Sequence, residues 1–286
     1  MCKKNFPIVD GIPVLLNEET SIFTINDIVS KKHDTEQETG KKSILAILRR
    51  LVPTDTKNFK AAANFEKIIR LVCAHSQKPL VLLVGAGTLG VGVKALVENK
   101  NITCIETDVI FGPRTQIICD AHNLPFASES LDGIVLQAVL EHVMDPYHCV
   151  EEARRVLVKN GIVYNEVPFM QQTHHKPYDF TRFTDLGHRR IFKQFQEIDR
   201  GIVVGPAVAF AWSFRYLFMS ITDKKILRKL IGVFCVFLTF WMKYLDYYFI
   251  RKSSSYEAAS GFYFLGRKSE QGISDKELLQ LYRGGK

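Results

Sequence analysis

The chain has 286 residues, of which 47% are hydrophobic, and a formal net charge of +8. This length accommodates one large α/β core with appendages and excludes a second catalytic domain. The six cysteines are scattered, several of them in predicted buried strands or helices, and none forms a C-x-x-C pair, which indicates reduced thiols in a cytoplasmic protein. Charged and turn-forming residues stand near the start in place of an apolar run, so we expect no secretory signal.

The first 30 residues contain one hairpin signal. Phe6–Leu16 holds two short β-prone runs around Asp10 and Gly11, and an Asp-Gly pair in that place predicts a β-hairpin. We expect a charged linker at Lys31–Gly40, followed by helices at Lys41–Leu51 and Asn58–Ala74.

The stretch Pro79–Val93 carries the strongest local signal. An apolar, β-branched run breaks into Gly85, Gly87 and Gly90 and then continues with helical spacing. This pattern is typical of a buried parallel strand that turns into a helix whose N-terminus receives a nucleotide-like ligand. The GxGxxG spacing fits a dinucleotide as well as S-adenosylmethionine.

Acidic residues follow the next two predicted strands. Asp108 follows a strand at Ile102–Ile105 and is our candidate for binding the ribose hydroxyls, with Glu106 as the alternative. Asp120 follows a strand at Gln116–Cys119. Its carboxylate and the backbone N–H of Ala121 could together bind the edge of an adenine. Dinucleotide enzymes have less need of such a contact, so it favours S-adenosylmethionine.

The segments that follow complete an α/β pattern. They are a strand from Leu131, the residues Glu141-His142, a helix at Val150–Val158, a helix stop at Lys159–Gly161 and a strand at Ile162–Val167. From about Pro79 to Phe195, this order resembles the class I S-adenosylmethionine-dependent methyltransferases, in the branch labelled methyltransferase type 11.

The resemblance implies a Rossmann-like, seven-stranded, mostly parallel sheet of order 3-2-1-4-5-7-6 with an antiparallel last strand. It assigns S-adenosyl-L-methionine as the cofactor and implies that its binding positions are Gly85, Gly87, Gly90, Asp108, Asp120 and Ala121. Leu83 stands where the family has an acid that helps to hold the cofactor's ammonium group. The alternatives are a non-catalytic scaffold of this fold and an NAD-dependent oxidoreductase.

The N-terminal hairpin has a resemblance of its own. It is similar to the end of a zinc-ribbon-like domain, related to the activator subunit of some transfer-RNA methyltransferases, with Cys2 in the place of the last knuckle cysteine. Its partner cysteines are absent, so we expect a metal-free cap at residues 1–30 and no metal site. The further divisions are a linker with helices at 31–78, a methyltransferase domain at 79–268 and a tail at 269–286.

Reactive side chains gather in Pro168–Thr184, after the fifth strand. A similar string recurs in the family branch found in bacterial surface-polysaccharide gene clusters, and its matching residues here are His174, Asp179 and Arg182. We assign His174 as the base for an acceptor hydroxyl, Asp179 to orient it or bind a sugar, and Arg182 to hold Asp179 or an anionic substrate group.

Other readings of this loop stay open. Asp179 and Arg182 could form a purely structural ion pair, His175 could replace His174 as the base, and His188 could join a metal site. Glu141-His142 faces the cofactor cleft in this fold, where it either contacts substrate or makes a structural hydrogen bond.

The part of the chain from Ser213 to Lys286 carries almost all of the net positive charge. Ala207–Phe218 is apolar, and Leu230–Met242 is uncharged but shorter than the about 20 residues of a membrane span. Lysines and arginines flank this segment, as do aromatic residues at Trp212, Trp241, Tyr244, Tyr247 and Tyr248. A helix lying in an anionic membrane interface fits this pattern. The alternatives are packing in the core or in a homodimer, and nucleic acid is an unlikely partner.

We expect strands six and seven at Ile198–Val204 and Gly261–Arg267, with a helical insertion at about 206–256 between them. The predicted function is O-methylation of a saccharide, or of a lipid-linked glycan intermediate, at the inner face of the cytoplasmic membrane. An RNA-modifying methyltransferase is a less favoured alternative.

Overall fold

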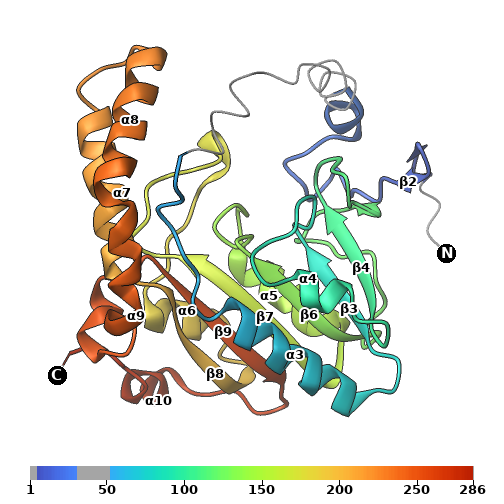
Figure 1. Cartoon of the computed structure of the whole chain (residues 1–286). Helices are drawn as coiled ribbons and strands as arrows, with labels where there is room; N and C mark the ends of the chain where they lie inside the picture. Colours follow the sequence, from blue (N-terminus) through green and yellow to red (C-terminus); the bar gives the residue numbers. More distant parts are fainter. Residues whose placement is uncertain (1–4, 31–51, 286) are drawn as a thin grey trace.

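A computed structural model describes residues 5–30 and 52–285 (Figure 1). Cys2, the expected linker at 31–40 and the expected helix at 41–51 lie outside these described residues.

The core is one seven-stranded sheet in the order β5-β4-β3-β6-β7-β9-β8. All its pairings are parallel except those of β9, which runs antiparallel to β7 and β8. The predicted order and the predicted antiparallel last strand are confirmed. The strands are β3 (Leu80–Val84), β4 (Thr103–Asp108), β5 (Ile117–Ile118), β6 (Leu131–Gln137), β7 (Leu157–Pro168), β8 (Phe195–Val204) and β9 (Gly261–Lys268).

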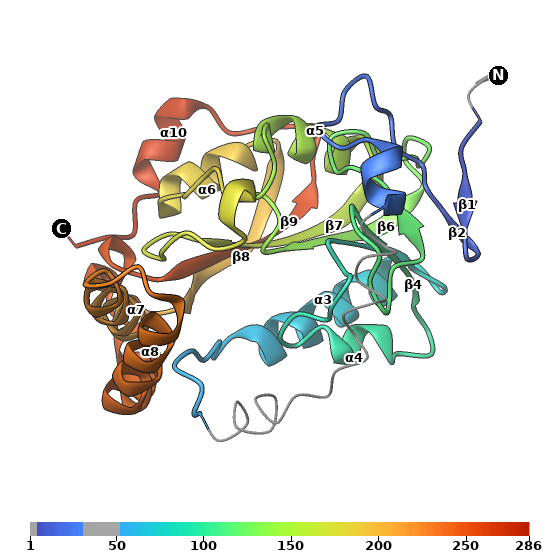
Figure 2. The same ribbon diagram turned by 90° about the horizontal axis from the view of Figure 1, so that it is seen from above.

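Helices cover both faces of the sheet (Figure 2). On one face, Phe65 and Leu96 pack with buried strand residues such as Leu83. On the other face, Val150 and Phe192 pack with residues such as Leu82. The helices of these two layers are α3 (Ala61–His75), α4 (Lys94–Val97), α5 (Pro146–Val156) and α6 (Asp185–Ile191), and α10 (Asp275–Gln280) follows β9.

The helix expected after the glycine motif is the short α4, which the chain reaches through turns. Gly92 lies in these turns with a φ of +87°, and a Cβ there would lie 2.8 Å from Phe65 Cδ2. One local expectation was wrong. The predicted helix stop at Lys159–Gly161 lies inside β7, which begins at Leu157. Asn160 has a φ of +64° there, and the register with β6 shifts, so the segment is an irregularity of the strand.

The N-terminal hairpin forms as expected. Asp10 and Gly11, with φ of +49° and +79°, connect β1 (Ile8–Val9) to β2 (Ile12–Pro13). The chain then adds to the sheet edge, where the Leu15 N–H donates to the Ile118 carbonyl at 2.8 Å. Val14 and Leu16 are buried against the same edge, so the hairpin is attached to β5.

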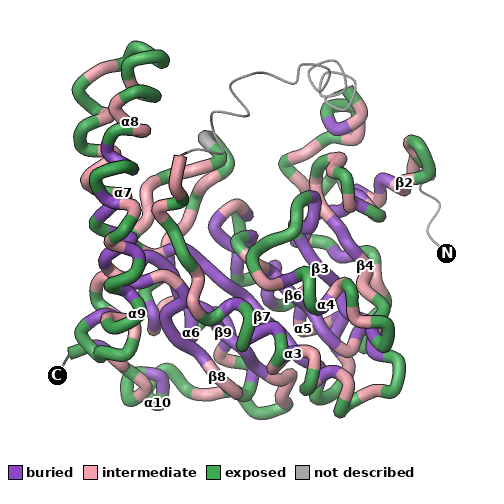
Figure 3. The backbone as a smooth tube through the Cα atoms, in the orientation of Figure 1, coloured by how far each residue is buried: buried purple, intermediate pink, exposed green. Residues whose placement is uncertain are grey.

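Between β8 and β9 the chain forms a helical hairpin that rises beyond the sheet (Figure 1). The hairpin is tied to the segment before α3, because Arg215 forms an ion pair with Asp55 and Lys243 donates to Thr54. Figure 3 shows that its upper half is largely exposed or half-buried. The helices of this insertion are α7 (Pro206–Met219), α8 (Lys225–Thr239), η2 (Phe240–Tyr244), α9 (Asp246–Phe249) and η3 (Ser253–Glu257).

A buried histidine makes the fold sensitive to acid. His188 Nε2 lies 2.6 Å from Asn165 Oδ1, and burial lowers the pKa of His188 to about 3. The unfolded chain, with a histidine pKa near 6.5, therefore binds a proton below that pH, whereas His188 in the folded chain stays neutral. We expect the free energy of unfolding to fall by about 2 kcal/mol between pH 6.5 and 5 from this residue alone.

Urea unfolding of the wild type and of His188→Gln at both pH values measures this effect. The glutamine can still donate to Asn165 but does not titrate, so the variant should lose less stability on acidification. Equal losses in the two proteins would contradict the prediction.

Candidate active site

The candidate residues lie at one edge of the sheet. β3, β4, β5, β6 and β7 run parallel, so their carboxyl ends meet at the same edge. The glycine motif, Asp108, Asp120, Glu141-His142 and the loop from Phe169 follow these five strands in turn. In open α/β sheets, ligands bind outside this edge.

The glycine turn after β3 has no space for a side chain at Gly85 or Gly87. Gly85 has a φ of +71°, and a Cβ there would lie 2.7 Å from Val139 Cγ2. The Gly87 N–H donates to Asp108 Oδ2 at 2.9 Å, and a Cβ at Gly87 would meet the same oxygen. The turn thus places bare backbone beside the carboxylate that follows β4.

The two acids of β4 have different roles. Glu106 is buried and forms a bidentate ion pair with Arg114, so its carboxylate is occupied by a structural partner. Asp108 is half-buried, and among the described residues its carboxylate accepts only from backbone N–H groups, those of Gly87 and, at 3.2 Å, Ile110. Asp108 therefore remains the candidate for the ribose hydroxyls.

The carboxylate that follows β5 is bound by the N-terminal segment. Asp120 is buried and accepts from Ser21 Oγ at 2.5 Å and from the His122 N–H at 3.0 Å. Although burial opposes it, the hydrogen bonds from His122 and Ser21 lower the pKa of Asp120. Ala121, the predicted adenine contact, is also buried. The sequence contains no signal for the Ser21 contact, which joins residues far apart in the chain.

The loop after β7 is organised by Arg182 and Asp179. The Asp179 side chain is fully buried and accepts two hydrogen bonds from the Arg182 guanidinium and one from the His174 N–H at 2.6 Å. Burial would raise the pKa of Asp179, but Arg182 and His174 lower it to about 2. Arg182 also donates to the Gln171 and Gln172 carbonyls, so this pair supports the loop.

His174 lies between this pair and the loop after β6. Its Nδ1 is 3.3 Å from Asp179 Oδ2, and its Nε2 is 3.8 Å from Glu141 Oε1. His142 Nε2 lies at the same 3.8 Å from that oxygen, and the His142 and His174 rings meet edge to face, with centroids 4.8 Å apart. The structure thus brings Glu141-His142 to the predicted catalytic loop.

Burial sets the charge of this cluster. Glu141 is 1% exposed, and burial raises its pKa to about 8. Burial likewise lowers the pKa values of His142 and His174, which favours neutral imidazoles at pH 7. A neutral imidazole carries a lone pair that can accept a proton or bind a cation.

The other histidines are placed differently. His175 is exposed, has a φ of +55° and lies beside His142, with ring centroids 4.8 Å apart. His188 is buried and hydrogen-bonded to Asn165, among the rings of Phe183, Phe192 and Phe264, so it does not join the His174 cluster.

Leu83 and Gln137 lie near the glycine turn. Leu83, at the position of the family acid, is buried in the core under α3. A Cβ on Gly90 would lie 1.9 Å from Gln137 Oε1, and this buried oxygen has no hydrogen-bond partner among the described residues. The Gln137 Nε2 donates to the buried Glu166 at 2.9 Å. Sequence reasoning missed Gln137 because it looked for a carboxylate at position 83.

Residues 83–165 match the family model described as a methyltransferase domain, and the strand order around them is the one that this class implies. This part of the chain is a class I methyltransferase domain. Its cofactor is S-adenosylmethionine, which decides between the two cofactors that the glycine spacing allows.

Solved structures similar to the methyltransferase are distant in sequence. The complex between the Trm112 methyltransferase activator of Haloferax volcanii and a methyltransferase has 17% identity, a TM-score of 0.47 and coverage of 74% of this chain and 90% of that chain. The 1,6-didemethyltoxoflavin-N1-methyltransferase of Burkholderia thailandensis, solved with 1,6-didemethyltoxoflavin and S-adenosylhomocysteine, has 13% identity and a TM-score of 0.44, covering 86% and 87% of the two chains. A search of curated proteins gives no match.

Proposed function

We propose that this methyltransferase O-methylates a saccharide hydroxyl, on a free sugar or on a lipid-linked glycan intermediate. The observation that carries the proposal is the cluster of Glu141, His142 and His174, which lies at the sheet edge that also carries the glycine turn. A hydroxyl is a weak nucleophile until its proton is removed, and these side chains can remove it.

When the cluster holds no metal, His174 is the side chain that accepts that proton. The acceptor oxygen forms a bond to the methyl carbon while the sulfur–carbon bond of S-adenosylmethionine breaks, with its electron pair remaining on sulfur. The hydroxyl proton moves to His174 Nε2, on the ring side that faces Glu141. Asp179 and Arg182 hold the loop, and since Asp179 is fully buried and engaged by Arg182, it positions His174 instead of binding sugar.

Gln137 is our candidate for binding the cofactor's ammonium group, which Leu83 cannot bind. Its unpartnered Oε1 faces Gly90, and an amide oxygen can accept hydrogen bonds from the ammonium group of the cofactor's methionine part.

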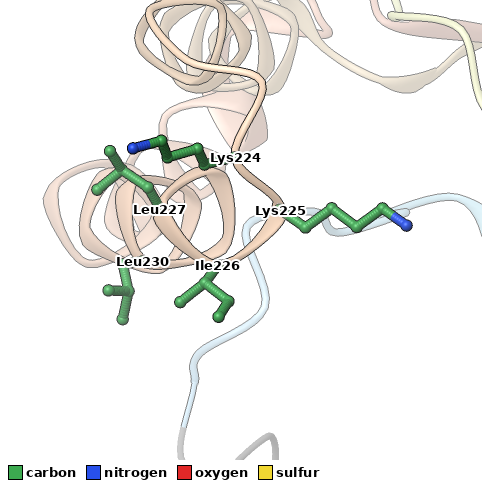
Figure 4. A pocket seen from close by; sticks show the side chains of 5 residues that line it. All are labelled: Lys224, Lys225, Ile226, Leu227 and Leu230. Atoms are coloured by element: carbon green, nitrogen blue, oxygen red, sulfur yellow. The ribbon is translucent and has the colours of Figure 1, made fainter.

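The helical hairpin supports a membrane-bound acceptor. Large apolar side chains are exposed on it: Leu217, Phe218, Ile221, Ile226, Leu227, Leu230, Phe234 and Phe237. At its tip, Ile226 and Leu230 project together from one side of α8, Lys225 extends outward near them, and Lys224 lies beside Leu227 on the opposite side (Figure 4). This combination suits an anionic bilayer interface, where the apolar groups enter and the lysines meet lipid phosphates.

The hairpin also contacts the catalytic loop, because Gln172 Nε2 donates to Ser213 Oγ of α7 at 3.0 Å. A membrane-bound hairpin would hold that loop near the lipid surface. Trp212 lies in the middle of α7, where its Nε1 donates to Thr56 Oγ1 at 3.1 Å. Within the described part of the chain, every helix is too short or too polar to span a bilayer, so the contact proposed is peripheral.

Asp108→Ala tests the cofactor site. If Asp108 binds the ribose hydroxyls, its loss should weaken S-adenosylmethionine binding by about 1–3 kcal/mol, or roughly 5- to 150-fold, with the fold intact. Isothermal titration calorimetry measures the affinity, and the exposed Asp223 supplies the control Asp223→Ala.

Unchanged affinity in Asp108→Ala would remove the ribose role from Asp108. A wild type that binds S-adenosylmethionine but methylates no sugar or glycolipid in a panel of acceptors would contradict the saccharide proposal and favour another acceptor or a non-catalytic scaffold.

A further inference from the structure

Three potential metal ligands from two separate loops converge at the sheet edge. Glu141 and His142 follow β6, and His174 follows β7. Their ligand atoms lie within 4.8 Å of one another. Metal–nitrogen and metal–oxygen bonds are about 2.0–2.2 Å, so two atoms on opposite sides of one ion are at most about 4.4 Å apart. Side chains whose ligand atoms spread over 4.8 Å would therefore draw together by a few tenths of an ångström on binding. Both Nε2–Oε1 distances, at 3.8 Å, are within that limit and too long for hydrogen bonds.

The hydrogen bond of His142 leaves its second nitrogen free for a metal. His142 Nδ1 lies 2.5 Å from the Tyr178 carbonyl oxygen, which can only accept a hydrogen bond. Nδ1 must therefore carry the hydrogen, and the neutral ring has its lone pair on Nε2, which faces Glu141. Metal-binding histidines are usually oriented in this way, by a carbonyl or a carboxylate at the other ring nitrogen. For His174, the groups beside Nδ1 are the Asp179 carboxylate, at 3.3 Å, and Arg182 Nη2, at 3.5 Å.

Glu141 supplies an independent indication of a missing partner. The residue is 1% exposed, and its Oε2 has no hydrogen-bond partner among the described residues. A buried carboxylate oxygen without a partner is costly, and native structures usually satisfy such atoms with a protein group, a water or an ion. Neither histidine nitrogen reaches hydrogen-bond distance of the carboxylate.

We propose that Glu141, His142 and His174 bind one divalent first-row transition cation, such as Mn²⁺ or Zn²⁺. Two imidazoles and one carboxylate favour these ions over Mg²⁺, which prefers oxygen ligands. Three protein ligands leave coordination positions open for water or for acceptor hydroxyls, and a sugar offers two adjacent hydroxyls to such positions. The statement that the acceptor is a sugar rests on the proposed function, whereas the cation site is argued from the geometry alone.

The cation changes the role of His174. When Nε2 is a ligand, it cannot take a proton, and the acceptor hydroxyl becomes acidic because it binds the cation. Its proton then leaves to water as the oxygen attacks the methyl carbon. Activity that persists in EDTA would therefore assign His174 as the base and contradict a catalytic cation.

Mn²⁺ titration of the EDTA-treated, dialysed full chain tests the site. Electron paramagnetic resonance measures free Mn²⁺, and we expect one bound ion per chain, displaced by Zn²⁺ but not by excess Mg²⁺. Asp179→Asn should weaken binding by about 10- to 100-fold, the usual effect of losing a group that orients a ligand, and His174→Ala should weaken it at least as much.

His148→Ala is the matched control, since His148 lies beside Glu151 on an exposed face of α5 and should not affect Mn²⁺ binding. Circular dichroism and S-adenosylmethionine affinity verify the fold of each variant. The inference is overturned if the wild type binds no Mn²⁺, or if His174→Ala binds it as the wild type does. Cofactor binding without Mn²⁺ binding refutes this inference alone, and Mn²⁺ binding without cofactor binding refutes the proposed function alone.

Discussion

His174→Ala is expected to lower kcat by about 10²–10⁴, the usual contribution of a residue that assists proton transfer. We expect a loss of kcat whether His174 acts as a base or as a cation ligand. Both roles use Nε2, which lies 3.8 Å from Glu141 Oε1. S-adenosylmethionine affinity should stay unchanged, since the predicted cofactor contacts lie on other segments. Steady-state kinetics with an acceptor that the wild type methylates measure kcat, and calorimetry measures the affinity for S-adenosylmethionine.

His175→Ala is the control for this prediction, because His175 neighbours His174 but is exposed. It should cost much less activity. Wild-type turnover in His174→Ala would make this histidine structural, and a large loss confined to His175→Ala would transfer the role to that residue.

The double variant Ile226→Ser, Leu230→Ser is expected to bind anionic vesicles at least about tenfold more weakly than the wild type. The two side chains are 78% and 63% exposed at the tip of the hairpin. Burying each in a bilayer interface is worth up to about 1.5–3 kcal/mol, and 1.4 kcal/mol corresponds to a factor of ten. Salt should weaken the binding of the wild type, because it screens the contribution of the basic residues. Vesicle co-sedimentation at two ionic strengths measures both effects.

Leu279→Ser provides a matched control, since Leu279 is 69% exposed on α10, away from the hairpin. It should leave vesicle binding unchanged. If the wild type ignores anionic vesicles, or if both variants bind equally well, the exposed apolar residues serve another contact and the lipid-linked acceptor loses its physical support.

Periodicity in the sequence predicted individual strands, and the family resemblance implied the sheet that they form. The apolar run before Gly85 and the alternation at Gly261–Arg267 correspond to β3 and β9. Pattern alone failed at Lys159–Gly161, which was predicted to stop a helix but lies inside β7, with a positive φ at Asn160. The helix that the spacing after Gly90 predicted is the four-residue α4, which follows Gly92 and its positive φ.

The sequence by itself determined the strands and the two loops that carry reactive side chains, because local patterns encode them. The order of its motifs, through the family resemblance, implied the methyltransferase fold and the cofactor class. Only the tertiary structure decided which of these side chains meet. Position along the chain does not reveal that Glu141 approaches His174, that Ser21 binds Asp120, or that Arg114 occupies Glu106. Such contacts depend on how parallel strands align their carboxyl ends and on which charged groups must find partners once they are buried.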